Sequence, residues 1–189
     1  MNDKDALRSQ LRAKRGTLAP AERSAHGQDA AQILSRSRHW QEASRVAVYM
    51  AADGELDPVS LVRLARAQGK SVYLPALSQN QTLRFLHWEE DAEMVLNRYG
   101  IPEPIASAPA AALSELDLVC LPLVAWSRDG TRLGMGGGFY DKTLAGNPRR
   151  GLLVGLAYNF QEQAQLPRDP WDVALDLVVT ESVLISCTS

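Results

Sequence analysis

The sequence predicts a three-layer α/β fold in which helices flank a mainly parallel sheet. Short apolar segments alternate with helical patterns along the chain, which is typical of a sheet covered by helices. One segment, 117–125, is apolar almost throughout, as expected for a strand buried on both faces. The 189 residues are 46% hydrophobic and 22% charged, which suits one globular domain spanning residues 1–189.

The first segment has the pattern of an amphipathic, cationic helix. Leu7 and Leu11 recur at helical spacing, while Lys4 and Arg8 occupy a neighbouring face. Because residues four apart on a helix are neighbours, Lys4 and Arg8 can reach the same anion. A merely solvated cationic face is the alternative.

Strands and helices alternate after this segment. A second helix is expected to open at Pro20, with Trp40 packing toward its end. A helix at 58–68 should end at Gly69. Strands are predicted at 46–50, 71–77, 83–88, 117–125, 152–157 and 173–180. The Pro- and Ala-rich segment 101–112 is predicted to be a long surface loop.

A glycine-rich stretch, residues 132–141 with the sequence RLGMGGGFYD, comes directly after the buried strand and directly before a predicted helix at 140–144. Ligands of open α/β sheets bind at the carboxyl ends of strands, and glycines there let backbone N–H groups converge on an anion. The stretch therefore predicts a polyphosphate site. A tight glycine turn without a ligand is the alternative.

Two common phosphate motifs do not fit this stretch. A P-loop needs glycine before the Lys142-Thr143 pair, but Asp141 stands there. A dinucleotide fingerprint starting at Gly134 would end on Phe139 instead of glycine.

Carboxylates near the glycine-rich stretch suggest a metal bridge to bound phosphates. Asp141 ends the stretch, and a carboxylate beside phosphates is what a Mg²⁺ bridge requires. Capping of the following helix is the alternative role. Asp172 and Asp176 are candidate second carboxylates. Glu55 follows the first strand at the sheet end where ligands bind, where it can accept hydrogen bonds from a heterocycle; the alternative, usual for such glutamates, is that it faces water.

Several function classes lose support. The net charge is −2 and the pI about 5.9, so no overall positive field attracts nucleic acid. No apolar run is long enough to span a bilayer, and the N-terminus lacks a signal-peptide core. The cysteine and histidine spacings match no zinc, redox or catalytic pattern; these residues are Cys120, Cys187, His26, His39 and His87. We expect a cytoplasmic monomer that binds no nucleic acid and no membrane.

Several motifs stand in order along the chain: Lys4-x-x-x-Arg8, the Gly54-Glu55-Leu-Asp57 turn, GIPEP at 100–104, RLGMGGGFYD at 132–141 and WDVALD at 171–176. This ordered set resembles the 5-formyltetrahydrofolate cyclo-ligase family over nearly the whole chain. The resemblance implies the fold of sugar-phosphate isomerases and CoA transferases. It also implies the conversion of 5-formyltetrahydrofolate and ATP to 5,10-methenyltetrahydrofolate, ADP and phosphate, with Mg²⁺ as the metal and a phosphorylated formyl group as the intermediate.

The resemblance also implies roles for individual residues. Asp141 and Asp172 would bind Mg²⁺. Lys4, Arg8, Arg132 and Asp141 would be catalytic. The folate would contact Met50, Glu55, Met135, Gly136, Gly137, Gly138 and Phe139. ATP would contact Lys4, Arg8, Arg132, Leu133, Gly134, Met135, Gly136, Gly137, Gly138, Phe139 and Tyr140.

Two alternatives from other classes stay open. A non-catalytic folate- or nucleotide-binding regulator would keep the fold and the binding residues. A sugar-phosphate isomerase of related fold is disfavoured, because the sequence offers no convincing histidine acid/base pair.

Overall fold

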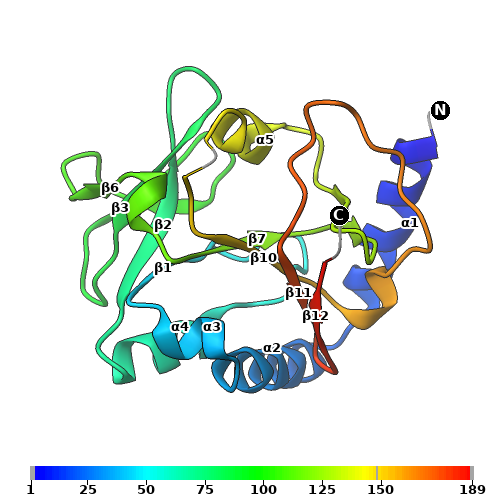
Figure 1. Ribbon diagram of the computed structural model, residues 1–189, viewed down its shortest axis with the longest axis horizontal. Helices are drawn as coiled ribbons and strands as arrows, with labels where there is room; N and C mark the ends of the chain where they lie inside the picture. Colours follow the sequence, from blue (N-terminus) through cyan, green and yellow to red (C-terminus); the bar gives the residue numbers. More distant parts are fainter. Residues whose placement is uncertain (1–2, 148, 188–189) are drawn as a thin grey trace.

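A mixed, mostly parallel sheet forms the centre of the computed structural model, which describes residues 3–147 and 149–187 (Figure 1). Its strand order is β12-β11-β10-β7-β1-β2-β3-β6, and four of the seven pairings are parallel. The five inner strands run parallel: β11 (Leu177–Val179), β10 (Leu152–Leu156), β7 (Leu118–Pro122), β1 (Arg45–Ala47) and β2 (Ser71–Leu77). The outer strands β12 (Leu184–Ser186), β3 (Leu83–His87) and β6 (Ala110–Ala111) pair antiparallel with their neighbours.

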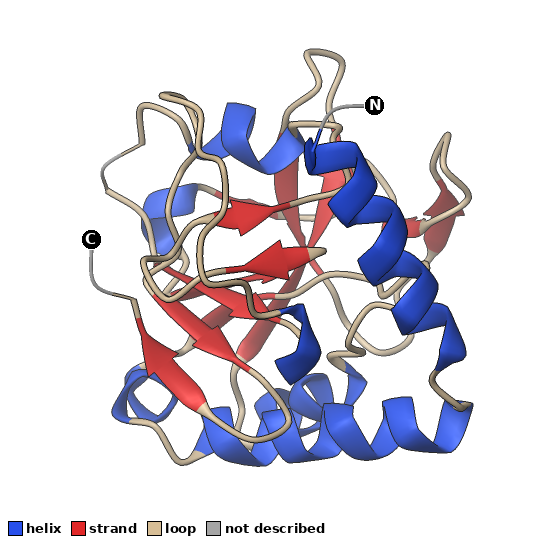
Figure 2. Ribbon diagram, turned by 90° about the vertical axis from the view of Figure 1, so that its right-hand side faces the viewer, coloured by secondary structure: helices blue, strands red, loops and turns tan. Residues whose placement is uncertain are grey.

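Helices complete the layers on both faces of the sheet. Three cover one face: α2 (Pro20–Ser35), α3 (Arg38–Glu42) and α4 (Val59–Ala67) (Figure 1). The short α5 (Phe139–Leu144) lies on the opposite face. Helix α1 (Asp3–Thr17) runs along one end of the molecule, as Figure 2 shows. Two single turns of 3₁₀ helix, η1 (Leu113–Glu115) and η2 (Asn159–Gln161), connect strands. The predicted fold class is confirmed.

The side chains of the inner strands alternate between two apolar clusters, as the period of two in a strand requires. Val46, Val72 and Leu118 point into the cluster under α2 and α4. Their neighbours Ala47, Tyr73 and Val119 point into the cluster under α5, with Trp126 and Leu144. Burial on both faces explains the continuous apolar pattern that marks 117–125 in the sequence.

That long apolar segment is nevertheless not one strand, as predicted, but two. Strand β7 ends at Pro122, and a separate β8 (Ala125–Trp126) pairs with β9 (Arg132–Leu133) in a small hairpin. Proline has no N–H to continue a ladder, so the chain leaves the main sheet there. The glycine-rich stretch therefore follows β9 of the hairpin, not a strand of the main sheet.

Other predicted boundaries change as well. The predicted strand 46–50 is cut to β1, and 173–180 shortens to β11, while β12 was not predicted. Trp40 lies on the separate α3, because Ser37 caps a new helix through a bond from the Trp40 amide. The segment 101–112 is not only a loop: it contains β6 and also β5 (Pro102–Pro104), which pairs with β4 (Met94–Leu96).

Helix α1 packs on the β8–β9 hairpin through a small third cluster. Leu11 of the helix meets Val124, Ala125 and Leu133, with Leu7 alongside. This is the apolar face that the sequence predicts, and it directs the cationic face of α1 toward the glycine-rich stretch. Within the described residues, no helix is long and apolar enough to cross a membrane.

Candidate active site

A pocket of about 860 Å³ opens at the carboxyl ends of the inner strands. Tyr49 and Met50 line it just after β1, Pro75 and Leu77 line it from the end of β2, and Pro122 lines it from the end of β7. Ligands of open α/β sheets bind at this end of the strands. The pocket therefore lies at the end of the sheet where the sequence predicts a site, although a hairpin separates the glycine-rich stretch from the strand.

Every residue that the family resemblance assigns to ATP, folate or metal lines this one pocket. Helix α1 contributes two of them, the segments after β1 contribute two, and a loop near β11 contributes one. The set is Lys4, Arg8, Met50, Glu55, Arg132, Leu133, Gly134, Met135, Gly136, Gly137, Gly138, Phe139, Tyr140, Asp141 and Asp172. Asp176 is not among them, because its carboxylate binds Arg150 and the Leu153 amide at 2.7 Å each.

The glycine loop, residues 134–138, presents free backbone donors to the pocket. Within the described part of the chain, none of its amides donates a hydrogen bond. Gly136 and Gly138 have positive φ angles of 97° and 65°, which turn the backbone in a way that other residues resist. Unpaired, converging N–H groups before a helix form a concave site for an anion.

Two cations from α1 face this loop. Arg8 donates from Nε to the carbonyl oxygen of Gly134 at 2.9 Å, and a Cβ added at Gly136 would lie 3.7 Å from its guanidinium carbon. Lys4 Nζ lies 2.7 Å from a carboxylate oxygen of Asp169 and 3.9 Å from one of Asp172. The i,i+4 spacing therefore brings both cations to the same side of the pocket, as the sequence predicts.

A third cation, Arg132, enters the pocket from β9. Its side chain is 6% exposed and donates from Nη2 to Asp141 Oδ1 at 2.5 Å. The other terminal nitrogen, Nη1, is buried and has no hydrogen-bond partner among the described residues. A buried, unsatisfied charged donor costs free energy unless a ligand pairs with it. Arg132 is thus poised to bind an anion.

The carboxylates fit a metal that arrives with phosphate oxygens better than a metal held by protein alone. Among the described residues, no group of three or more His, Cys, Asp or Glu side chains is arranged to hold an ion. Asp141 Oδ1 already accepts from Arg132 and from the Val173 amide at 3.2 Å, and Asp172 is the residue before Val173. Mg²⁺ in nucleotide sites is commonly bound through one or two carboxylates plus substrate phosphates.

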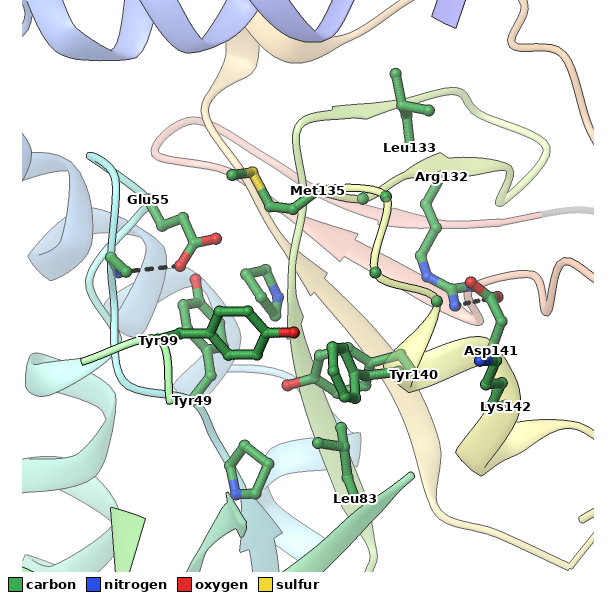
Figure 3. A pocket seen from close by; sticks show the side chains of 18 of the residues that line it. Tyr49, Glu55, Leu83, Tyr99, Arg132, Leu133, Met135, Tyr140, Asp141 and Lys142 are labelled. Atoms are coloured by element: carbon green, nitrogen blue, oxygen red, sulfur yellow. Dashed lines mark hydrogen bonds and ion pairs between the residues drawn. The ribbon is translucent and has the colours of Figure 1, made fainter. Parts of the chain in front are cut away.

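Glu55 lies on the other side of the pocket from Arg132 and Asp141, with Tyr99 and Tyr140 between them (Figure 3). Its carboxylate accepts from the Ala52 amide at 3.1 Å, which closes a tight turn. Burial raises the pKa of Glu55 above its usual range, partly offset by the Ala52 amide. A half-buried carboxylate of raised pKa is suited to pair with the N–H groups of a polar ring.

Two tyrosines form the floor between these sides. Tyr49 is 4% exposed and donates its hydroxyl to the Leu56 carbonyl at 2.5 Å. Burial raises the pKa of the Tyr49 and Tyr140 phenols, with the charge of Glu55 adding to both. Both therefore stay neutral and offer flat apolar surfaces to a ligand.

The sequence reasoning missed residues that the hairpin β4–β5 and the loop before β11 bring to the pocket mouth. Tyr99, 58% exposed, meets Phe139 edge-to-face at 5.9 Å between ring centroids. Trp171 is 66% exposed, and Asp169 pairs with Lys4. The sequence pattern predicts a loop at 101–112 and gives no sign of the hairpin. For the other loop, the signal available in the sequence was Trp171, directly before Asp172.

The fold and the site together define an α/β enzyme. Its pocket has a backbone anion site on one side and a half-buried carboxylate on the other. Comparison with known proteins then gives the family. The model of the 5-formyltetrahydrofolate cyclo-ligase family matches residues 1–181. The chain belongs to this family, and it is an enzyme of the ligase class.

Individual relatives agree with this assignment. The chain is 39% identical over 176 residues to 5-formyltetrahydrofolate cyclo-ligase of Escherichia coli K12. This match covers 91% of this chain and 97% of the relative. It is 36% identical over 178 residues to the Haemophilus influenzae protein of the same name, covering 92% and 95%. The solved structure of Aquifex aeolicus 5,10-methenyltetrahydrofolate synthetase aligns with a TM-score of 0.85 at 30% identity, covering 98% and 93%.

Proposed function

We propose that this enzyme converts 5-formyltetrahydrofolate and ATP to 5,10-methenyltetrahydrofolate, ADP and phosphate in a Mg²⁺-dependent reaction. The unpaired amides of the glycine loop, facing Arg8 and Arg132, are the observation that carries the proposal. We further propose that residues 1–189 act as one domain and as a cytoplasmic monomer.

The chemistry explains why a phosphate site adjoins a folate site. The formyl oxygen on N5 attacks the γ-phosphorus of ATP, and ADP leaves. The resulting N5 iminium carries a phosphorylated oxygen, so its carbon is open to attack by N10. After N10 loses its proton, the N5 lone pair expels phosphate and the methenyl bridge forms.

The proposed division of the pocket follows its charges. Lys4, Arg8 and the amides of the glycine loop bind the phosphates and neutralise the charge that develops on the transferred phosphoryl group. Asp141 and Asp172 would hold Mg²⁺ together with phosphate oxygens, where the ion would neutralise further charge. On the other side, Met50 and Glu55 bind the folate, and Glu55 accepts from its ring N–H groups.

No covalent enzyme nucleophile is part of this mechanism. The protein contributes position and charge, which supply most of the catalysis in phosphoryl transfer. The Arg132–Asp141 pair joins the two ends of segment 133–140, which would contact both substrates under this proposal.

Purified protein tests the proposal directly. Incubation with 5-formyltetrahydrofolate, ATP and Mg²⁺ should give the near-ultraviolet absorbance of the methenyl product and one phosphate for each product formed. Omitting ATP should abolish both signals. Binding of both ligands without either signal would contradict the proposal and favour a regulator, and turnover of a sugar phosphate without ATP would favour an isomerase.

A further inference from the structure

Arg15 is a buried arginine that is absent from the pocket lining and touches three segments that build the pocket. Its side chain is fully buried, at 0% exposure. Nη2 donates to Asp53 Oδ2 at 2.5 Å and lies 3.7 Å from Met135 Sδ, while Nη1 donates to the Leu123 carbonyl at 3.2 Å. One guanidinium thus joins the turn after β1, the glycine loop and the end of β7.

The turn that Arg15 contacts has a backbone that needs support. Asp53 has a φ of 51° and Gly54 a φ of 71°. A positive φ is unfavourable for an aspartate, so the surrounding structure must hold it. Gly54 also packs against Arg15 itself, because an added Cβ would lie 3.4 Å from both the Arg15 Cβ and its carbonyl oxygen. Arg15 therefore supports the turn through its side chain and its backbone.

The same turn carries Glu55. The Glu55 amide donates to the Ala52 carbonyl at 2.9 Å, and the Ala52 amide donates to the Glu55 carboxylate at 3.1 Å. These two bonds fix the carboxylate relative to residues 52–55. Met135 and Glu55 lie on the same side of the pocket in Figure 3. Arg15 is therefore placed behind the half of the pocket that we assign to folate.

Arg12 supplies a natural comparison on the same turn of α1. It donates to both Asp53 oxygens, at 2.7 and 3.3 Å, but its side chain is 45% exposed. A solvent-exposed ion pair contributes little, whereas a buried one costs much to break because the remaining charge stays unpaired. The two arginines thus share a partner but differ in burial.

We propose that Arg15 is a positioning residue that holds the 53–55 turn, and with it Glu55, in the geometry that binds the folate. Helix α1 then serves both substrates: Lys4 and Arg8 face the phosphate side, while Arg15 fixes the folate side. The assignment of the two sides rests on the proposed function, but the support of the turn does not.

Hydrogen–deuterium exchange of the ligand-free protein tests the support directly. Arg15→Met, which keeps the bulk and removes the donors, should accelerate exchange of the Ala52 and Glu55 amides. Exchange in β10 should stay at the wild-type rate, and Arg12→Met should have a much smaller effect on the turn. Unchanged exchange at residues 52–55, or equal acceleration in β10, would overturn the proposal. If Arg15→Met does not fold, Asp53→Asn, which removes the negative charge that pairs with Arg15 but keeps the shape of the side chain, must accelerate exchange of the same amides.

Steady-state kinetics tests the link to folate. Arg15→Met should raise KM for 5-formyltetrahydrofolate roughly tenfold while KM for ATP stays within about twofold, because Arg15 forms its ion pair with the turn on the folate side and reaches the glycine loop only through the Met135 side chain. Arg15→Lys should recover part of this loss by keeping the charge. Equal rises in both KM values would contradict a folate-side role. A wild-type protein without turnover would refute the proposed function, and the exchange experiment would still decide the role of Arg15.

Discussion

Arg132 and Asp141, nine positions apart, close the wall that carries the glycine loop through an ion pair of 2.5 Å. Among the residues that the structure describes, the pair leaves one buried Arg132 nitrogen without a partner and one Asp141 oxygen outside the pair. Arg132 and Asp141 line the pocket on the side away from Glu55 (Figure 3). The site is thus charged and preorganised where phosphates are expected, which makes its residues testable one by one.

Asp141→Asn should lower kcat roughly 100-fold, because the amide keeps an acceptor for the Val173 amide but loses the charge that a metal needs. Turnover measured over a Mg²⁺ titration checks this. Glu162→Gln is the matched control, since Glu162 forms a comparable 2.6 Å pair with Arg128 on the surface. Wild-type turnover by Asp141→Asn at saturating Mg²⁺ would contradict its metal role.

Lys4→Met and Arg8→Met should each raise KM for ATP roughly tenfold, as expected for the loss of one charged hydrogen bond to phosphate. KM for 5-formyltetrahydrofolate should change much less. Lys14→Met, on the same helix but directed at the Phe160 ring, serves as the control. An equal rise in KM for Lys14→Met would mean that the overall charge of α1 matters and that the direction of the individual side chains does not.

Gly136→Ala should strongly reduce ATP binding, because φ is 97° and the added methyl group would lie against the Arg8 guanidinium. Gly69→Ala is a control of similar backbone strain, with φ of 69° and nothing within 4 Å of the added Cβ. Each substitution should cost about 1 kcal/mol of unfolding free energy. Only Gly136→Ala should weaken binding of ATP measured by calorimetry, and equal weakening would refute the backbone anion site.

Glu55→Gln should change how stability depends on pH. Burial raises the folded-state pKa of Glu55, so the folded protein binds more protons than the unfolded chain between the usual value of 4.5 and that raised pKa. The contribution of Glu55 to the free energy of unfolding is therefore greatest at low pH and falls as pH rises through that window. Denaturant unfolding at a series of pH values should show Glu55→Gln gaining stability relative to wild type as pH rises.

Glu115, a glutamate whose pKa is shifted in the opposite direction, provides a check on the Glu55 result. Hydrogen bonds from the Ala112 amide and Arg45 lower the pKa of Glu115. Its contribution to stability is present above the usual value and is lost as pH falls. Glu115→Gln should therefore lose stability relative to wild type as pH rises, the reverse of Glu55→Gln. Parallel slopes for the two variants would show that the burial of Glu55 is not the cause.

Helix α1 shows how far sequence reasoning reached. Its apolar spacing predicted one face against the protein and Lys4 and Arg8 on another, and both features are present. The prediction succeeded because a helix fixes the relative directions of residues four apart. The same local logic placed α5 after the glycines and the central strands within a few residues.

The break at Pro122 and the hairpin β4–β5 show where sequence reasoning stopped. Segment 118–126, which covers β7, β8 and the two residues between them, is apolar throughout. The periodicity therefore gave no sign that the chain leaves the main sheet. The hairpin is held by a pairing of short, weakly patterned segments, including a bond from Asn97 to Glu103 at 3.1 Å. Its contribution of Tyr99 to the pocket therefore could not be predicted.

The sequence by itself determined the fold class, the amphipathic α1 and the residue set whose order resembles one family, because these depend on local periodicity and motif order. Only the tertiary structure decided that Lys4, Glu55, Arg132 and Asp172 share one pocket, since their meeting depends on how strands far apart in sequence pair. The structure alone also revealed Arg15. A charged residue in a helical pattern is expected to face water, and only the packing of three distant segments buries this one.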